Sequence, residues 1–99
     1  MLFRSTMKYP VPDFVVEVLS GSTEHRDRGV KFEDFEANGV GEYWLIDPKT
    51  KTVEQYVLEN GRFQLRLKTE SGEIESVVVT GFRIPIEAIF DSQIGRAHV

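Results

Sequence analysis

The feature that most constrains the fold is an acidic residue inside the most apolar run of the chain, from Phe14 to Leu19. Strong β-formers flank Glu17 on both sides, and such a run is typical of a strand covered on both faces, as in a parallel or mixed sheet. Burying an ionised carboxylate without a partner costs several kcal/mol or more, so a buried acid is normally protonated, paired or metal-bound. Glu17 therefore needs a partner, and Lys31, on the helix expected to follow, is the natural candidate.

A helix and a second apolar strand are predicted after this run. Residues 20–23 form a turn with an N-cap signature, and Asn38-Gly39 is a C-cap signal, so a helix is expected from about residue 23 to 38. The nearly all-apolar segment Glu42–Asp47 predicts the second strand. A strand, a helix and a strand in this order form a βαβ unit, whose strands are parallel.

The rest of the chain predicts antiparallel hairpins. Strands are expected over Thr52–Leu58, Arg62–Lys68 and Ile74–Val79, with turns between them, and Ile84–Phe90 reads as a short closing helix with proline in its first turn. In the middle strand, alternation places Phe63, Leu65 and Leu67 on one face. The predicted fold class is α/β with a mixed sheet: one βαβ unit followed by β-hairpins.

Composition narrows the function classes. The net charge of −4 argues against a general nucleic-acid-coating protein, which would be basic, but not against a metal-dependent enzyme, whose ion supplies local positive charge. The chain has no cysteine, which excludes disulfides and thiolate metal sites and fits a cytoplasmic location. It has no apolar run long enough to span a membrane and no signal peptide at Met1.

Both ends of the chain look foreign to the domain. Residues 94–99 match one reading frame through a sequencing adapter and are interpreted as a non-native scar, and Met1 to Met7 shows no periodicity. The domain is therefore expected over residues 8–91.

Two acids on one face of the first strand are the candidate metal ligands. Asp13 and Glu17 share a face by the period-two rule, but four residues separate them by about 13 Å, so both cannot hold one ion on a straight strand. Glu17 is the better site candidate, and Asp13, after Pro12, is the weaker one. Lys31 reads either as a solvated lysine or as the partner of Glu17.

The other polar candidates have ordinary structural interpretations. His25, Arg26 and Arg28 are interpreted as exposed helix charges, with a phosphate contact as the alternative. Tyr43 and Trp44 are expected in the core, and Asp47 is expected to be a turn residue before Pro48, although it ends a parallel strand, where sites often form.

Several motifs together resemble a known family. They are Pro12-Asp-Phe-Val-Val-Glu-Val-Leu-Ser20, Ser22-Thr23, Asp27-Arg-Gly-Val-Lys31, Gly39-Val-Gly-Glu-Tyr-Trp-Leu-Ile-Asp-Pro48 and the ending Phe82-Arg-Ile-Pro with Ile89-Phe90. In order and spacing they resemble the Uma-two family of endonucleases, over about residues 10 to 91. The resemblance implies a restriction-endonuclease-like fold of the PD-(D/E)xK nuclease superfamily.

The resemblance also implies an activity and roles for residues. It implies Mg²⁺- or Mn²⁺-dependent hydrolysis of DNA, with Glu17 as metal ligand, the carbonyl of Val18 as a further ligand, and Lys31 as the catalytic cation. Leu19 stands where the superfamily motif has lysine, and the resemblance implies that this lysine has migrated to the helix, at Lys31. Family members carry an upstream Pro-Asp strand, so the chain is expected to be the C-terminal part of the domain and inactive alone.

Two alternatives stay open at this point. The chain is either part of a DNA endonuclease or a non-catalytic interaction domain in which Glu17 and Lys31 form a buried ion pair. The sequence leaves a homodimer open.

Overall fold

The computed structural model describes residues 10–21 and 27–90. Its elements in chain order are β1 (Phe14–Val18), the π-helical turn η1 (Asp27–Lys31), α3 (Phe32–Ala37), β2 (Glu42–Asp47), β3 (Thr52–Glu59), β4 (Arg62–Thr69), β5 (Glu73–Glu75), β6 (Arg83–Pro85) and α4 (Ile86–Ile89). No helix in these ranges has the length and apolar character that crossing a membrane requires.

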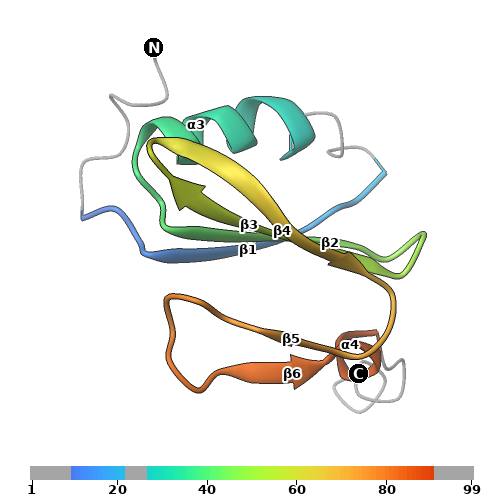
Figure 1. Cartoon of the computed structure of the whole chain (residues 1–99). Helices are drawn as coiled ribbons and strands as arrows, with labels where there is room; N and C mark the ends of the chain where they lie inside the picture. Colours follow the sequence, from blue (N-terminus) through green and yellow to red (C-terminus); the bar gives the residue numbers. More distant parts are fainter. Residues whose placement is uncertain (1–9, 22–26, 91–99) are drawn as a thin grey trace.

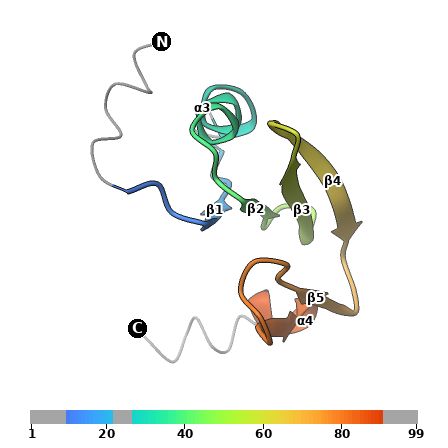
Figure 2. The same cartoon turned by 60° about the vertical axis from the view of Figure 1, so that its left-hand side comes forward.

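The predicted mixed sheet is confirmed. The order of its four strands is β1-β2-β3-β4, with β1 and β2 parallel and the other pairs antiparallel. The segment containing η1 and α3 lies on one face of this sheet, and the small β5–β6 sheet with α4 lies below the other face (Figure 1, Figure 2). The parallel β1–β2 pair and the helical residues 27–37 confirm the βαβ prediction, while residues 22–26 of the predicted helix lie outside the described ranges.

Strand β2 is the centre of the molecule because both of its faces are covered. All six of its residues are buried. On the helix side the buried residues are Leu19, Val40, Tyr43, Leu45 and Phe63, against which Phe32 and Phe35 of α3 pack. On the other side they are Trp44, Ile46, Val53, Ile74 and Ile86. Tyr43 and Trp44 are 0% and 2% exposed, as predicted for core aromatics.

The prediction that β1 is covered on both faces is wrong for its outer face. Val16 and Val18 are 43% and 57% exposed. The β5–β6 unit reaches the start of the strand, where the rings of Phe14 and Phe82 lie 6.1 Å apart, but it packs mainly on β2. In the sheet of the described residues β1 is also an edge strand, since it is the first in the order β1-β2-β3-β4.

The prediction of a strand over Ile74–Val79 is also wrong beyond Glu75. The backbone N–H groups of Val77 and Val78 donate to a side chain, the carboxylate of Glu42, and that of Val79 donates to the hydroxyl of Ser76. These N–H groups are consequently not available to a β-ladder.

The closing helix is shorter than expected. Pro85 is extended, with φ −64° and ψ 139°, and precedes α4 rather than lying inside it. A residue before proline is itself driven toward extended geometry, so Ile84 joins β6 instead of the helix.

A β-bulge in β4 changes one predicted face. The register shifts between Gln55 and Tyr56, whose partners are Leu67 and Leu65. Arg66 is the extra residue, and the side chains that follow it are reversed. Phe63 therefore lies in the helix-side cluster, while Leu67 packs on the opposite side.

Candidate functional site

The predicted pair of Glu17 and Lys31 meets under the helix. Lys31, the last residue of η1, donates from Nζ to Oε1 of Glu17 over 3.1 Å. Val15 and Leu19, two residues to either side of Glu17, belong to the helix-side core, so the alternation of β1 directs Glu17 to the same face. The predicted proximity of these two side chains is confirmed.

The burial predicted for Glu17 is wrong. Its side chain is 24% exposed and that of Lys31 is 37% exposed, because β1 is an edge strand. A pair this accessible to water contributes little to stability, on the order of 0–1 kcal/mol. The carboxylate and the amine can therefore be reached by a ligand in solution.

Asp13 is exposed and lies one residue before the start of β1. Its backbone carbonyl accepts a hydrogen bond from the amide of Glu42 over 3.0 Å. Three strand residues still lie between it and Glu17, and an extended chain of this length spans about 13 Å. The backbone role of Asp13 is thus a structural one, and its assignment as a metal ligand stays a prediction.

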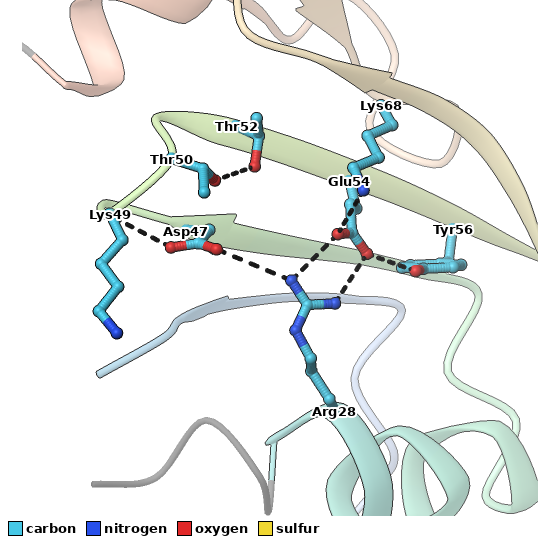
Figure 3. Close-up of polar contacts among 8 residues, drawn as sticks. All are labelled: Arg28, Asp47, Lys49, Thr50, Thr52, Glu54, Tyr56 and Lys68. Carbon is cyan, nitrogen blue, oxygen red and sulfur yellow. Dashed lines mark hydrogen bonds and ion pairs between the residues drawn. The ribbon is translucent and has the colours of Figure 1, made fainter. Parts of the chain in front are cut away.

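Next to this pair lies a second, more buried group of charges, drawn in Figure 3. Arg28, also on η1, donates to Glu54 from both terminal nitrogens, with Nη1–Oε1 and Nη2–Oε2 distances of 3.4 and 3.2 Å. Its Nη2 lies 3.9 Å from Oδ2 of Asp47. Lys68 Nζ lies 3.8 Å from Oε2 of Glu54, and the hydroxyl of Tyr56 donates to Oε1. We call Arg28, Asp47, Glu54, Tyr56 and Lys68 the Glu54 cluster.

The Glu54 cluster corrects one interpretation and confirms another. Arg28 is not merely an exposed helix charge, because its guanidinium donates two hydrogen bonds to the Glu54 side chain, which is only 4% exposed. His25 and Arg26 lie outside the described ranges. Asp47 is the expected turn residue, since its Oδ1 accepts the amide of Lys49 over 3.0 Å.

The cluster keeps Glu54 ionised. Burial alone would raise the pKa of Glu54, but the hydrogen bonds from Tyr56 and Arg28 and the charges of Arg28 and Lys68 outweigh it and hold the pKa below its usual range. Burial and the neighbouring carboxylate raise the pKa of Tyr56, so this phenol stays protonated and remains a donor.

The most buried acid of the described residues is on the opposite face of the sheet. Glu42 is 0% exposed and accepts five hydrogen bonds. The donors are Trp44 Nε1, Gln55 Nε2, Ser76 Oγ and the amides of Val77 and Val78, at 2.7, 2.6, 2.7, 2.9 and 3.1 Å. All five are uncharged groups.

These bonds keep Glu42 ionised in spite of its burial. Desolvation would raise its pKa, but the hydrogen bonds, first that from Gln55, hold the pKa below its usual range. Glu42 thus fastens the segment 76–78 onto the sheet, which is a structural task.

Acid should weaken the fold through Glu42 and Glu54. Each has a folded-state pKa below the ordinary value of 4.5. Each carboxylate therefore contributes stability that is fully present above pH 4.5. This contribution is lost as the pH falls below 4.5 and through the folded-state pKa. Urea unfolding at a series of pH values from roughly 7 to 3 should show this loss, and Glu42→Gln should flatten it. Glu73→Gln, at an exposed position, should keep the wild-type slope; an unchanged slope in Glu42→Gln would contradict the assignment.

Sequence reasoning missed the structural importance of Glu42 and Glu54. Period-two alternation places Glu42 beside Trp44 and Ile46 on one buried face, and Glu54 on the same face as Tyr56. That signal was available in the sequence. The donors were not, because Ser76 and Arg28 lie 34 and 26 residues away from the acids that they bind.

A cavity opens at the carboxyl ends of the two parallel strands. It has a volume of about 240 Å³ and is lined by Leu19, Ser20, Gly21, Asp47, Pro48 and Lys49. Ligands of open α/β sheets commonly bind at this end of parallel strands. The cavity thus lies at the end of the sheet where ligands of such folds commonly bind.

The described residues fit a divalent metal ion only in part. Glu17 offers a partly exposed carboxylate, the ligand type that Mg²⁺ prefers. Within residues 10–21 and 27–90, however, no group of three or more His, Cys, Asp or Glu side chains could hold a metal ion. Glu17 is therefore a candidate ligand and not by itself a complete metal site.

Comparison with protein families gives one match. The family model described as Uma2, "Putative restriction endonuclease", matches residues 4–87, which is most of the chain. No curated protein matches the chain.

Proposed function

Because the chain belongs to the Uma2 family of restriction-endonuclease-like proteins, we propose that it forms part of a nuclease that hydrolyses phosphodiester bonds of DNA with a divalent ion. The observation that supports this most directly is the 3.1 Å contact between Lys31 Nζ and Glu17 Oε1, because it brings together a cation and an acid that the motif of the superfamily places side by side.

In the proposed site each residue has a separate task. Glu17, with the backbone carbonyl of Val18, would hold Mg²⁺ or Mn²⁺, and such an ion supplies Lewis-acid activation of water and phosphate. Lys31 would orient the scissile phosphate and stabilise the negative charge that develops on it during hydrolysis. The partial exposure of both side chains allows the phosphate to displace the direct contact between them.

The proposal includes a further acidic ligand upstream of Asp13, as the family resemblance implies, with residues 8–91 forming part of the complete domain. Asp13 is a weaker candidate for the second acidic ligand than an upstream acid, given the length of strand between it and Glu17. The proposed location is the cytoplasm, which the cysteine-free sequence fits. A homodimer stays a prediction.

A second candidate function is a non-catalytic interaction domain. The direct amine–carboxylate contact favours it, since an ion pair of this kind is complete without a metal ion or substrate. In this alternative Glu17 and Lys31 only attach η1 to β1.

Plasmid cleavage separates the two candidates. The chain and a version extended by the upstream coding sequence of its gene are incubated with supercoiled DNA and Mg²⁺, Mn²⁺ or a chelator. We expect the extended version to nick or linearise DNA with either ion and to stop with chelator, while the 99-residue chain cuts little because its metal ion is under-ligated. Strong chelator-sensitive cutting by the 99-residue chain would refute the need for an upstream ligand. An extended protein that cuts under no condition would support the interaction domain.

A further inference from the structure

Lys31 and Arg28 stand on the same π-helical turn but reach to different strands. Lys31 contacts Glu17 on β1, and Arg28 contacts Glu54 on β3. In the register of the sheet Glu17 is opposite Leu45, and Leu45 is opposite Glu54, so the two acids lie on one face with one strand between them. Two interstrand spacings separate their backbones by about 10 Å. The turn thus touches the sheet at two distinct points.

The two points differ in strength. The Glu17 contact has partly exposed partners, and such pairs hold a geometry weakly. The Glu54 side chain is 4% exposed, receives both terminal nitrogens of Arg28, and is itself fixed by Tyr56 and Lys68. Two parallel N–H···O bonds between a guanidinium and a carboxylate fix orientation as well as distance. Figure 3 shows the guanidinium reaching from the helix to the sheet between Glu54 and Asp47.

The backbone of this segment is also unusual. Residues 27–31 form a π-helical turn directly before the α-helical residues 32–37. Such turns are rare and are found frequently at functional sites. In this turn Arg28 is followed three residues later by Lys31, so only a short stretch of backbone connects the two sheet contacts.

From these observations we propose that Arg28 and Glu54 are positioning residues, which hold η1 on β3 and thereby place the Lys31 amine against Glu17. This inference deepens the proposed function and rests on it for its catalytic consequence. Its geometric part, that the Arg28–Glu54 contact sets the Glu17–Lys31 contact, can be tested without any nuclease activity.

The geometric test is a zero-length crosslink. A carbodiimide joins a carboxylate to an amine only when the two touch, so the yield of the Glu17–Lys31 amide, read by mass spectrometry of the 99-residue chain, reports their contact. Arg28→Lys keeps the charge but loses the two-point fork, and Glu54→Gln keeps the shape but loses the charge. We expect the crosslink to weaken in Arg28→Lys and to be lost in Glu54→Gln.

A matched control comes from the other end of the same helix. Glu36 on α3 accepts the backbone amide of Phe63 over 2.6 Å and also lies 3.6 Å from Arg62 Nε, so it too ties the helix to the sheet. Glu36→Gln makes the same chemical change as Glu54→Gln at a contact remote from Lys31. We expect it to leave the crosslink at its wild-type yield. Circular dichroism identifies variants that fail to fold, and Arg28→Lys, at a side chain that is 37% exposed, is the variant that keeps the test valid if Glu54→Gln unfolds.

The catalytic consequence is read in the extended protein. In Glu54→Gln the Lys31 amine should be misplaced, which should lower kcat on the order of 100-fold with little change in KM. The reason is that a catalytic group displaced by an ångström loses most of its effect on the transition state. Arg28→Lys should show an intermediate loss, and Glu36→Gln should show none.

The outcomes are distinguishable. If folded Arg28→Lys and Glu54→Gln keep the wild-type crosslink, the positioning role is wrong, whether or not the protein cuts DNA. If Glu36→Gln loses the crosslink equally, general docking of the helix explains the contact and the positioning role is again wrong. If the crosslink falls only in the Arg28 and Glu54 variants, the positioning role holds even where no variant or wild type cuts DNA, and in that case it is the proposed nuclease function that fails.

Discussion

Replacing Glu42 by alanine should strongly destabilise the fold. The five donors that now point at this carboxylate would lose their acceptor inside a site that is 0% exposed. A buried donor left unsatisfied costs about 1–3 kcal/mol, and because water can enter part of the space we expect a total loss of about 3–5 kcal/mol. That is a large part of the stability of a typical domain, which is about 5–15 kcal/mol. Urea unfolding followed by tryptophan fluorescence measures it, since Trp44 itself donates to Glu42.

Two further variants define the origin of this loss. Glu42→Gln keeps one acceptor oxygen but loses the charge and places an NH₂ group against the hydrogen-bond donors. It should therefore lower the free energy of unfolding by about 1.5–3 kcal/mol. Glu73→Ala removes an exposed acid from β5 and should stay within about 0.5 kcal/mol of wild type. If Glu42→Ala were as stable as Glu73→Ala, the hydrogen bonds to Glu42 would not be what fastens residues 76–78 to the sheet.

The second large effect concerns activity. In the extended protein Glu17→Gln should abolish metal-dependent cleavage, because the glutamine amide preserves shape but lacks the charge that a divalent ion requires. Lys31→Ala should lower kcat by about 10²–10³-fold, the loss typical when one group that stabilises transition-state charge is removed. Quantifying nicked plasmid over time in Mg²⁺ measures both effects.

Stability separates this result from simple unfolding. The Glu17–Lys31 pair is partly exposed, so both variants should stay within about 1 kcal/mol of wild type in urea. Glu33→Gln on the exposed side of α3 and Lys51→Ala in the β2–β3 turn are the matched controls and should cut normally. Wild-type cleavage by folded Glu17→Gln would remove Glu17 from the site. In the interaction-domain alternative neither variant changes cleavage, because there is none to change.

The parallel β1–β2 pair was predictable because its signals are local. Two apolar runs flank a helix whose C-cap signal, Asn38-Gly39, is visible in the sequence, and Gly39 adopts left-handed geometry with φ 83°. Lys31 was predictable as the partner of Glu17 because the helix that follows β1 brings it to the face of the sheet on which Glu17 lies, although the burial of Glu17 that first suggested a partner is wrong.

Other features were unpredictable because they depend on distant groups. The length of β5 is decided by whether the amides of Val77 and Val78 bind a strand or the Glu42 carboxylate, and β2 lies more than thirty residues earlier in the chain. The exposure of Val16 and Val18 likewise depends on where the β5–β6 unit packs, not on the apolar run itself. The bulge at Arg66 places Leu67 on the opposite face of the sheet from the one predicted. No residue type in β4 indicates that a bulge occurs there.

The Glu42 network also has a consequence for the order in which the chain becomes structured during synthesis. When β2 leaves the ribosome, the groups at 76–78 that bind its acid have not yet emerged with it, since they follow 34 to 36 residues later. Until then the carboxylate keeps its hydration, because stripping water from an uncompensated charge is too costly. The nascent chain can therefore close the side of β2 that faces α3 while the other side stays wet. The emergence of Val78 from the ribosome supplies the last of these donors, and only from that point can the second half of the core become dry.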